Sequence, residues 1–254
     1  MTEQSRIIMV WIGAAGIAFL LLCGILNLPK FGQYPGPYGD LINSAAPFER
    51  QVTNVVSAIN FDYRALDTLG EEFILFGAVS GVILLLRGSR GESLNASPRP
   101  TEAGRPIETR SEAIPWFSFA LVVIINLFGI YMVLHGNLTP GGGFQGGAIL
   151  GTASMLVYVG NGYRVYRQTT SKRLVELVEA IGAGSYSLIG IGAMIAGEAF
   201  LTNVLPLGTR GNLLSGGTIP LINFAVGLEV AAGFALLFLE FLKETRADEP
   251  EDQS

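Results

Sequence analysis

A series of long apolar segments constrains this chain more than any other feature of its sequence. Each is close to the roughly 20 residues that a helix needs to cross the hydrocarbon core of a bilayer. A helix satisfies its own backbone hydrogen bonds, as lipid requires of a spanning segment. The pattern therefore predicts an all-α, polytopic membrane protein with about six transmembrane helices. The predicted spans are 7–28, 68–86, 114–135, 144–160, 174–202 and 219–242.

The composition agrees with a membrane protein and excludes several other classes. Of the 254 residues, 50% are hydrophobic and 15% are charged, and the mean hydropathy is +0.46. The single cysteine, Cys23, lies inside an apolar segment, which leaves neither a disulfide framework nor a Cys/His metal cluster. Phosphate-binding, zinc and haem motifs are missing, as is any basic, aromatic-interleaved stretch for nucleic acid. We expect no enzyme activity, no cofactor and no metal other than ions in transit.

The first span has a rival interpretation as a secretory signal peptide, because Arg6 precedes it near the N-terminus. The apolar segment is longer than the core of a typical signal peptide, and no small-x-small cleavage site follows it. A membrane anchor is the favoured interpretation.

The remaining polar segments predict how the chain is divided. Residues 29–50 are rich in Pro, Gly and Tyr and predict an interfacial loop. Residues 52–64 have apolar side chains at helical spacing and predict a short amphipathic helix at the membrane surface. Residues 87–112 predict a linker between a two-helix region, 1–86, and a four-helix domain, 113–243. The acidic tail, 244–254, is predicted to be disordered.

The positive residues predict the orientation. Most of the 16 lysines and arginines fall on one side if the spans alternate, and only Lys30, Arg50, Arg64 and Arg210 fall on the other. Positive residues accumulate in cytoplasmic loops. We therefore expect a multi-pass protein of the cell membrane with both termini in the cytoplasm.

Residues 135–147 form a segment that we call the glycine box. It reads His-Gly-Asn-Leu-Thr-Pro-Gly-Gly-Gly-Phe-Gln-Gly-Gly and lies between the third and fourth predicted spans, on the external side. Pro140 ends the arriving helix, and the glycines after it allow positive φ and close approach of a neighbouring backbone. Gly143, Gly147 and Gly151 are four residues apart, which predicts a helix-packing face. The predicted structural motif comprises Gly136, Pro140, Gly141, Gly142, Gly143, Gln145, Gly146 and Gly147.

Glu229 is the sharpest candidate for chemistry, because it lies near the middle of the last span. A carboxylate at that depth costs on the order of 3 kcal/mol, so it has to face protein or water. It either exchanges a proton or contacts a cation in transit, which is the favoured hypothesis, or it is a neutral structural acid. Asn126 and Asn223 are better explained as hydrogen-bonding contacts between helices.

Other ionisable groups have two interpretations each. The acidic group Asp62, Asp67, Glu71 and Glu72 either borders a cation path or caps the second span and pairs with Arg64. His135, at the end of the third span, either handles protons or anchors the glycine box.

Glu176 and Glu179 stand one turn apart beside Lys172 and Arg173, at the start of the fifth span. This spacing predicts a solvated, ion-paired helix start.

The glycine box resembles the signature of the MnhB component, the B-type subunit of the multisubunit Mrp-type sodium/proton antiporters. Similar subunits occur in membrane-bound hydrogenase and sulfane-reductase complexes. The run Ile219-Pro-Leu-Ile-Asn-Phe-Ala-Val-Gly-Leu-Glu-Val230 resembles the last helix of the same family. Together the two resemblances cover residues 112–245.

The run from Asn54 to Glu71 is similar to the C-terminal end of the A-type subunit of the same antiporters. The resemblance implies a fusion of two neighbouring components and places Asp62, Asp67 and Glu71 near a cation path. Two departures stand out: Asn137 where many members have a second histidine, and Asn60 where an aliphatic residue is usual.

The resemblance implies a subunit of a large assembly that exchanges Na⁺ for protons. Its partners would be the other subunits, the lipid bilayer and the two ions, with no nucleic acid. Two alternatives remain: a purely structural connecting subunit, and the equivalent subunit of a redox-driven, hydrogenase-like complex. We expect the path candidates to be Glu229, Asp67, Glu71, Asp62 and His135.

Overall fold

The computed structural model describes residues 3–28, 36–93 and 113–246, in which the regular elements are helices and no strand occurs. This confirms the all-α class. The chain forms two compact units, Met1–Leu41 and Ile42–Ser254. Most of the predicted linker and most of the predicted acidic tail, residues 94–112 and 247–254, lie outside the described residues.

The first unit consists mainly of α1 (Glu3–Leu26), which contains the predicted anchor. Apart from the half-buried Cys23, its described side chains are exposed within the unit. Trp11, for example, is 71% exposed. A helix that is apolar all round is suited to lipid, where no further protein is needed to cover it.

The second unit begins within α2 (Pro37–Glu49), where the sequence predicted a loop. That prediction was wrong for residues 37–49. Pro37 stands at a first helical position, where its missing N–H is harmless, and Asp40 in the first turn suits the helix dipole.

A short α3 (Val55–Ala58) and a π-helix, η1 (Ile59–Tyr63), follow α2. They confirm the short helix predicted over 52–64. The π-helical turn was not predicted, because the apolar spacing of so few residues does not distinguish it from an α-turn.

Five longer helices complete the described part of this unit. Four of them, together with α1, are long and apolar enough to cross a membrane. The exception is α6, where Gln145 and several glycines lower the hydropathy, although α6 packs along α5 and α8. The helices are α4 (Ala65–Ser93), α5 (Ala113–Leu134), α6 (Gly143–Thr169), α7 (Lys172–Ile195) and α8 (Ile219–Arg246).

Several helix ends differ from the prediction. α4 continues beyond 86 to Ser93, so the linker begins later than expected, and α8 passes 242 to reach Arg246. α6 continues beyond 160, with a break at Gly162, whose φ is 79°. α7 stops at Ile195 instead of 202, and Gly197, with φ 87°, lies just beyond its end. Glycine adopts these positive φ values without strain, and single-sequence periodicity does not reveal where it does so.

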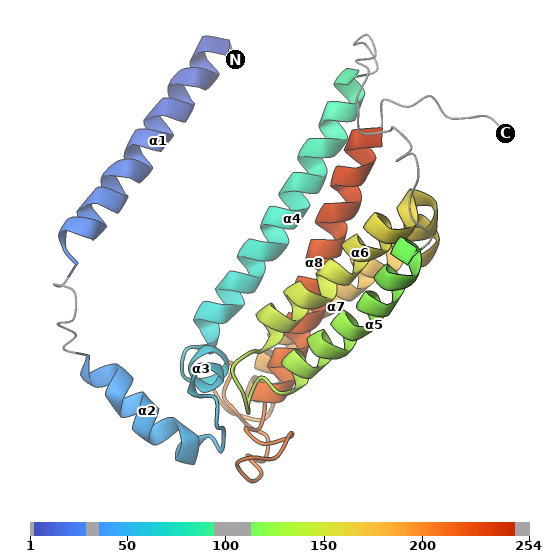
Figure 1. The fold of residues 1–254 in the computed structure, drawn as a ribbon. Coiled ribbons are helices and arrows are strands. Elements are labelled where there is room, and N and C mark those ends of the chain that lie inside the picture. The colour runs from blue at the N-terminus through green and yellow to red at the C-terminus, as the bar shows by residue number, and fades with distance from the viewer. Residues whose placement is uncertain (1–2, 29–35, 94–112, 247–254) are drawn as a thin grey trace. The chain divides into compact units, whose positions relative to one another are not determined.

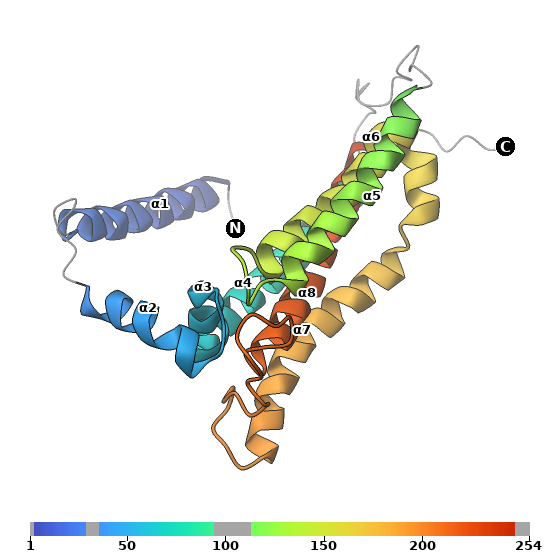
Figure 2. The ribbon, with the colours of Figure 1, turned by 60° about the horizontal axis from the view of Figure 1, so that its bottom comes forward.

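α8 is the central helix of the second unit. It packs against α4, α6 and α7, and Figures 1 and 2 show it running along these neighbours. In its most apolar window 61% of the residues are buried, against 17% in α4 and α5. Its buried apolar face includes Ile222, Val226, Val230 and Leu236. A polar group within this window of α8 therefore lies in a more enclosed setting than the corresponding windows of α4 and α5 provide.

The glycine box closes one end of this unit beside α3 and the loop before α8 (Figure 1). Gly141 and Gly142 have φ values of 145° and 137°, which side chains rarely adopt. The backbone N–H of Gly143 donates to Oδ1 of Asn223, 3.0 Å away. Asn223 therefore caps α6 from α8, which is the interhelical role expected of it, whereas Asn126 bonds the carbonyl of Val122 on its own helix.

Asn54 holds the box to the N-terminal part of the second unit. Its amide donates to the carbonyl oxygens of Gly136 at 2.7 Å and Thr139 at 3.0 Å, and its Oδ1 accepts from the N–H of Val56 at 3.1 Å. The box carbonyl of Asn137 in turn accepts from the N–H groups of Thr53 and Asn54.

We predict that Asn54→Ala lowers the stability of the assembled protein by about 2 kcal/mol, since it removes a helix cap and leaves carbonyl groups of the box without donors. The measurement is the midpoint of thermal unfolding of the detergent-solubilised complex. Asn126→Ala is the control, because that amide bonds only within its own helix. Equal midpoints for the two variants would contradict the role of Asn54.

Candidate functional site

Three glutamates from three helices are buried in the second unit. Glu229 of α8 is 1% exposed, Glu72 of α4 is 2% exposed and Glu179 of α7 is 6% exposed. Glu229 interacts electrostatically with both of the others. We call these three residues the glutamate cluster. Ionised side chains are seldom buried so completely unless they are paired.

Glycines allow α7, α8 and α4 to approach closely at the cluster. A Cβ built on Gly182 of α7 would lie 2.5 Å from the backbone nitrogen of Glu229, so no side chain fits there. A Cβ on Gly233 of α8 would lie 3.3 Å from Val79 of α4 and 3.8 Å from Oε1 of Glu179. The small residues of α7 and α8 thus bring the carboxyl groups together.

Glu72 and Glu229 face each other, and neither has a positively charged partner in the part of the chain that the structure describes. Their carboxyl groups lie within hydrogen-bonding reach of each other, and none of the four oxygens accepts a hydrogen bond from another described group. The ion pairs of the described residues do not include either carboxyl. Two buried carboxylates without compensation cost several kcal/mol, so the pair requires a proton or a cation.

Tyr186 of α7 covers the cluster on the side of η1. It is fully buried, and its hydroxyl donates to the carbonyl oxygen of Ala65, 2.8 Å away. Tyr186 also interacts electrostatically with Glu72 and lies beside the buried hydroxyl of Thr68. This end of the cluster is therefore polar.

A cavity of about 360 Å³ borders the opposite end of the cluster. It lies between α4, α7 and α8, and Glu179 and Glu176 both line it. Glu176 is paired with Lys172 at 3.5 Å, as the sequence predicted. The prediction that Glu179 is also solvated was wrong, because the packing of α4 and α8 encloses it.

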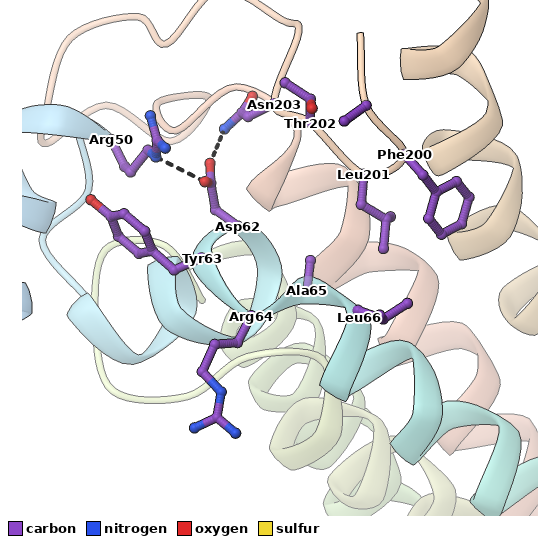
Figure 3. Close-up of a pocket in the computed structure, with 11 residues that line it drawn as sticks. Arg50, Asp62, Tyr63, Arg64, Ala65, Leu66, Phe200, Leu201, Thr202 and Asn203 are labelled. Carbon is purple, nitrogen blue, oxygen red and sulfur yellow. Dashed lines mark hydrogen bonds and ion pairs between the residues drawn. The ribbon is translucent and has the colours of Figure 1, made fainter. Parts of the chain in front are cut away.

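A larger cavity of about 650 Å³ lies at η1, between Asp62 and the segment 199–203 (Figure 3). The carboxylate of Asp62 lies 2.8 Å from Nε of Arg50 and accepts from the amide of Asn203, also at 2.8 Å. Arg50 also lies over the ring of Tyr63, 4.9 Å from its centre. Burial and a hydrogen bond to Glu49 raise the pKa of Tyr63 to about 12, so its hydroxyl stays a donor.

The structure does not gather all of the predicted path residues in one place. Asp67 and Glu71 are exposed on α4, and Asp67 pairs with Arg64, whose Nε lies 2.6 Å from its Oδ2. Asp62 lies at the η1 cavity. His135 is at the edge of the box, where its ring stacks on Tyr131 with centres 4.0 Å apart and its Nδ1 lies 3.1 Å from the carbonyl oxygen of Tyr131.

The predicted path residues did not include Glu179, nor Glu72, which the sequence analysis considered only as a member of the acidic group. A usable signal existed for Glu72, since it shares a helical face with Ala65, Leu69 and Val79, all buried, whereas Glu71 falls outside that face. Glu179 shares a helical face with Gly182 and Tyr186, both buried, but the charged residues Lys172, Arg173 and Glu176 one to two turns earlier favoured a solvated helix start. In the described part of the chain, no group of His, Cys, Asp or Glu has the arrangement of a metal site.

A further buried acid, Glu240 of α8, was not anticipated. It is fully buried and pairs with Lys172 of α7 at 2.6 Å. This ion pair ties α7 to α8 and, unlike the pair of Glu72 and Glu229, it is electrostatically balanced.

The chain shows similarity to proteins of known families. Residues 115–236 match a domain family described as related to the MnhB subunit of Na⁺/H⁺ antiporters. An uncharacterized protein of Methanocaldococcus jannaschii is 33% identical over 72% of this chain and 75% of its own length. A probable A/B subunit of a K⁺/H⁺ antiporter from Rhizobium meliloti is 26% identical over 79% of this chain, but the match spans only 21% of that relative. The B-type subunit of the Na⁺/H⁺ antiporter of Bacillus subtilis is 34% identical over 32% of this chain and 55% of the relative.

Two solved structures share the fold. A chain of the membrane-bound sulfane sulfur reductase, an archaeal respiratory membrane complex, aligns over 93% of this chain and 98% of that chain, with a TM-score of 0.68 and 29% identity. A chain of the Mrp complex from Dietzia aligns over all of this chain and 27% of that chain, with a TM-score of 0.69 and 23% identity. This chain is a multi-pass membrane protein that belongs to the family related to the MnhB subunit of Na⁺/H⁺ antiporters.

Proposed function

We propose that this chain is one component of a multisubunit antiporter that exchanges Na⁺ for protons, and that the glutamate cluster forms part of its ion path. The observation that carries the proposal is the pairing of Glu72 with Glu229, two buried carboxyl groups that have no basic partner among the described residues. Ionisable groups at membrane depth that lack a structural partner are typical of proton and cation pathways. The other subunits and the lipid bilayer would be its partners, in the cell membrane, with both termini in the cytoplasm.

The order of polar groups along the helices supports a path through the second unit. From one end it passes Asp62 at the η1 cavity, then Thr68 and Tyr186, then the glutamate cluster, and it ends at the cavity beside Glu176. Adjacent acids give a proton or cation successive positions of similar free energy. Asp67 and Glu71 remain candidates for a second path on the outer face of α4, which a neighbouring subunit would have to complete.

Glu72→Gln should reduce cation-dependent proton antiport by about tenfold or more, because glutamine fills the same space but cannot lose a proton. The measurement is the collapse of an imposed pH gradient on addition of NaCl to vesicles that carry the whole complex. Glu198→Gln is the matched control, since Glu198 is exposed beyond the end of α7. Wild-type transport by an assembled Glu72→Gln complex would show that the carboxyl is structural, as in a purely connecting subunit.

A second candidate function is the equivalent subunit of a redox-driven complex. The structural match to the sulfane sulfur reductase chain favours it, because that match covers nearly the full length of both chains. The same vesicles separate the two functions. Transport driven by an imposed gradient without an electron donor supports the antiporter, and transport that requires an oxidisable donor supports the redox-driven complex.

A further inference from the structure

The η1 cavity has features that a simple surface hollow lacks. Asp62 lies in its wall with only 7% of its side chain exposed, between Arg50 on one side and Asn203 on the other (Figure 3). Arg64 also lines the cavity, but Figure 3 shows its side chain directed away from Asp62, and it pairs with Asp67 instead. Arg50 is therefore the positive charge that acts on Asp62.

The backbone around the cavity is strained on both sides. Among the residues that the structure describes, two besides glycine have positive φ: Gln51 at 53°, directly after Arg50, and Leu201 at 63°, in the opposite wall. Side chains other than glycine seldom adopt such conformations, and residues that do so concentrate at functional sites. Their joint presence here indicates that the surrounding contacts hold the cavity in this form.

The cavity is connected to the glutamate cluster. Its wall includes Ala65, whose carbonyl oxygen accepts from the hydroxyl of Tyr186, and Tyr186 interacts with Glu72. Asn203 provides a second connection, because its Oδ1 accepts from the N–H of Thr218 at 2.9 Å, one residue before α8 begins. The contacts of Asp62 thus lead to the helices that carry Glu72 and Glu229.

We propose that the η1 cavity is a monovalent-cation entrance to the ion path, and that Arg50 competes with the cation for the carboxylate of Asp62. A cation in the cavity would contact the Asp62 carboxylate only when the guanidinium of Arg50 moves away from that carboxylate. Arg50 can make this movement while it stays over the ring of Tyr63. The ion pair therefore sets how readily a cation occupies the entrance. This inference rests on the proposed ion path, because an entrance without a path would have no role.

Arg50→Gln should lower the NaCl concentration that gives half-maximal antiport by about tenfold, because it removes a positive charge a few ångströms from the cation position. Asp62→Asn should act in the opposite direction and raise the half-maximal concentration. Arg210→Gln is the matched control: Arg210 lies over the ring of Phe48, 4.6 Å from its centre, and does not line the cavity.

A second measurement reports on the cavity without transport. Thr202, in its wall, is replaced by cysteine in a protein whose single native cysteine, Cys23, is serine. The ratio of its reaction rates with a cationic and an anionic methanethiosulfonate reagent is measured in the solubilised complex. Arg50→Gln should raise the ratio about tenfold and Asp62→Asn should lower it, whereas Arg210→Gln should leave it within about twofold. A nonspecific loss of structure would not move two variants in opposite directions.

The outcomes separate this inference from the proposed function. If Arg50→Gln and Arg210→Gln give the same rate ratio and the same half-maximal concentration, the entrance is wrong, whatever the glutamates do. If the ratio shifts as expected but the Glu72→Gln complex transports like the wild type, the proposed path is wrong and the entrance loses its role.

Discussion

Replacing Glu229 with glutamine should leave the complex assembled and stop its cation-dependent proton transport. Glutamine keeps the volume of the side chain and its capacity for hydrogen bonds, but it cannot exchange a proton or offer a charge to a cation. Because the wild-type carboxyl is buried and no described residue gives it a positive partner, its removal should leave the stability of the complex unchanged or raise it. We expect a loss of antiport of at least about tenfold, measured in vesicles beside Glu198→Gln.

The pairing of Glu229 with Glu72 adds a sharper test. If the two carboxyl groups act as one unit, the double variant should transport no less than either single variant, because groups that act together are strongly non-additive. A double variant that is a further tenfold slower than both single variants would show that the two groups act independently. Normal antiport by the assembled Glu229→Gln complex would remove the central residue of the path.

The second large effect is expected at Gly143, where α6 meets α8. A Cβ there would lie 2.5 Å from the carbonyl oxygen of Asn223 and 2.6 Å from two atoms of Val226, so neither neighbour can yield without moving α8. We predict that Gly143→Ala destabilises the protein by about 3 kcal/mol, the upper range for overpacking, and sharply lowers the yield of assembled complex.

Gly184→Ala is the matched control for Gly143→Ala. Gly184 is also helical, but a Cβ there would have no atom within 4 Å. Alanine at that position should be neutral or slightly stabilising, because glycine weakens a helix interior. The midpoint of thermal unfolding and the amount of assembled complex are the measurements. If Gly143→Ala and Gly184→Ala give the same midpoint and the same amount of complex, the glycines of the box do not serve to pack it closely against α8.

The two predictions assign different roles to the two parts of the chain. The glycine box fixes where α8 lies, through Gly143 and Gly147, whose built Cβ atoms would meet Asn223, Val226 and Val230 of α8. The positions of α4, α7 and α8 then set the distances between the three carboxyl groups of the glutamate cluster. A change in the box should therefore reduce the amount of complex, whereas a change in the cluster should reduce the activity of a complex that still forms.

The sequence by itself determined the class of the protein, the positions of most helices and the glycine box. Long apolar segments leave few folds available in a membrane, since backbone polar groups have to be satisfied within each segment. The same reasoning singled out Glu229 as a candidate ion-path residue, because a carboxylate in the middle of an apolar segment is conspicuous without any structure. It failed for α2, because the proline and glycine content of this segment is typical of a loop.

Only the tertiary structure decided which acids belong together. Glu71 and Glu72 are adjacent in sequence, yet one is exposed and the other is buried against α8. Glu179 looked like part of a solvated helix start, but the close approach permitted by Gly182 encloses it beside Glu229. Burial depends on how three helices pack, which is a property of contacts between distant residues and cannot be read from the local pattern of any one segment.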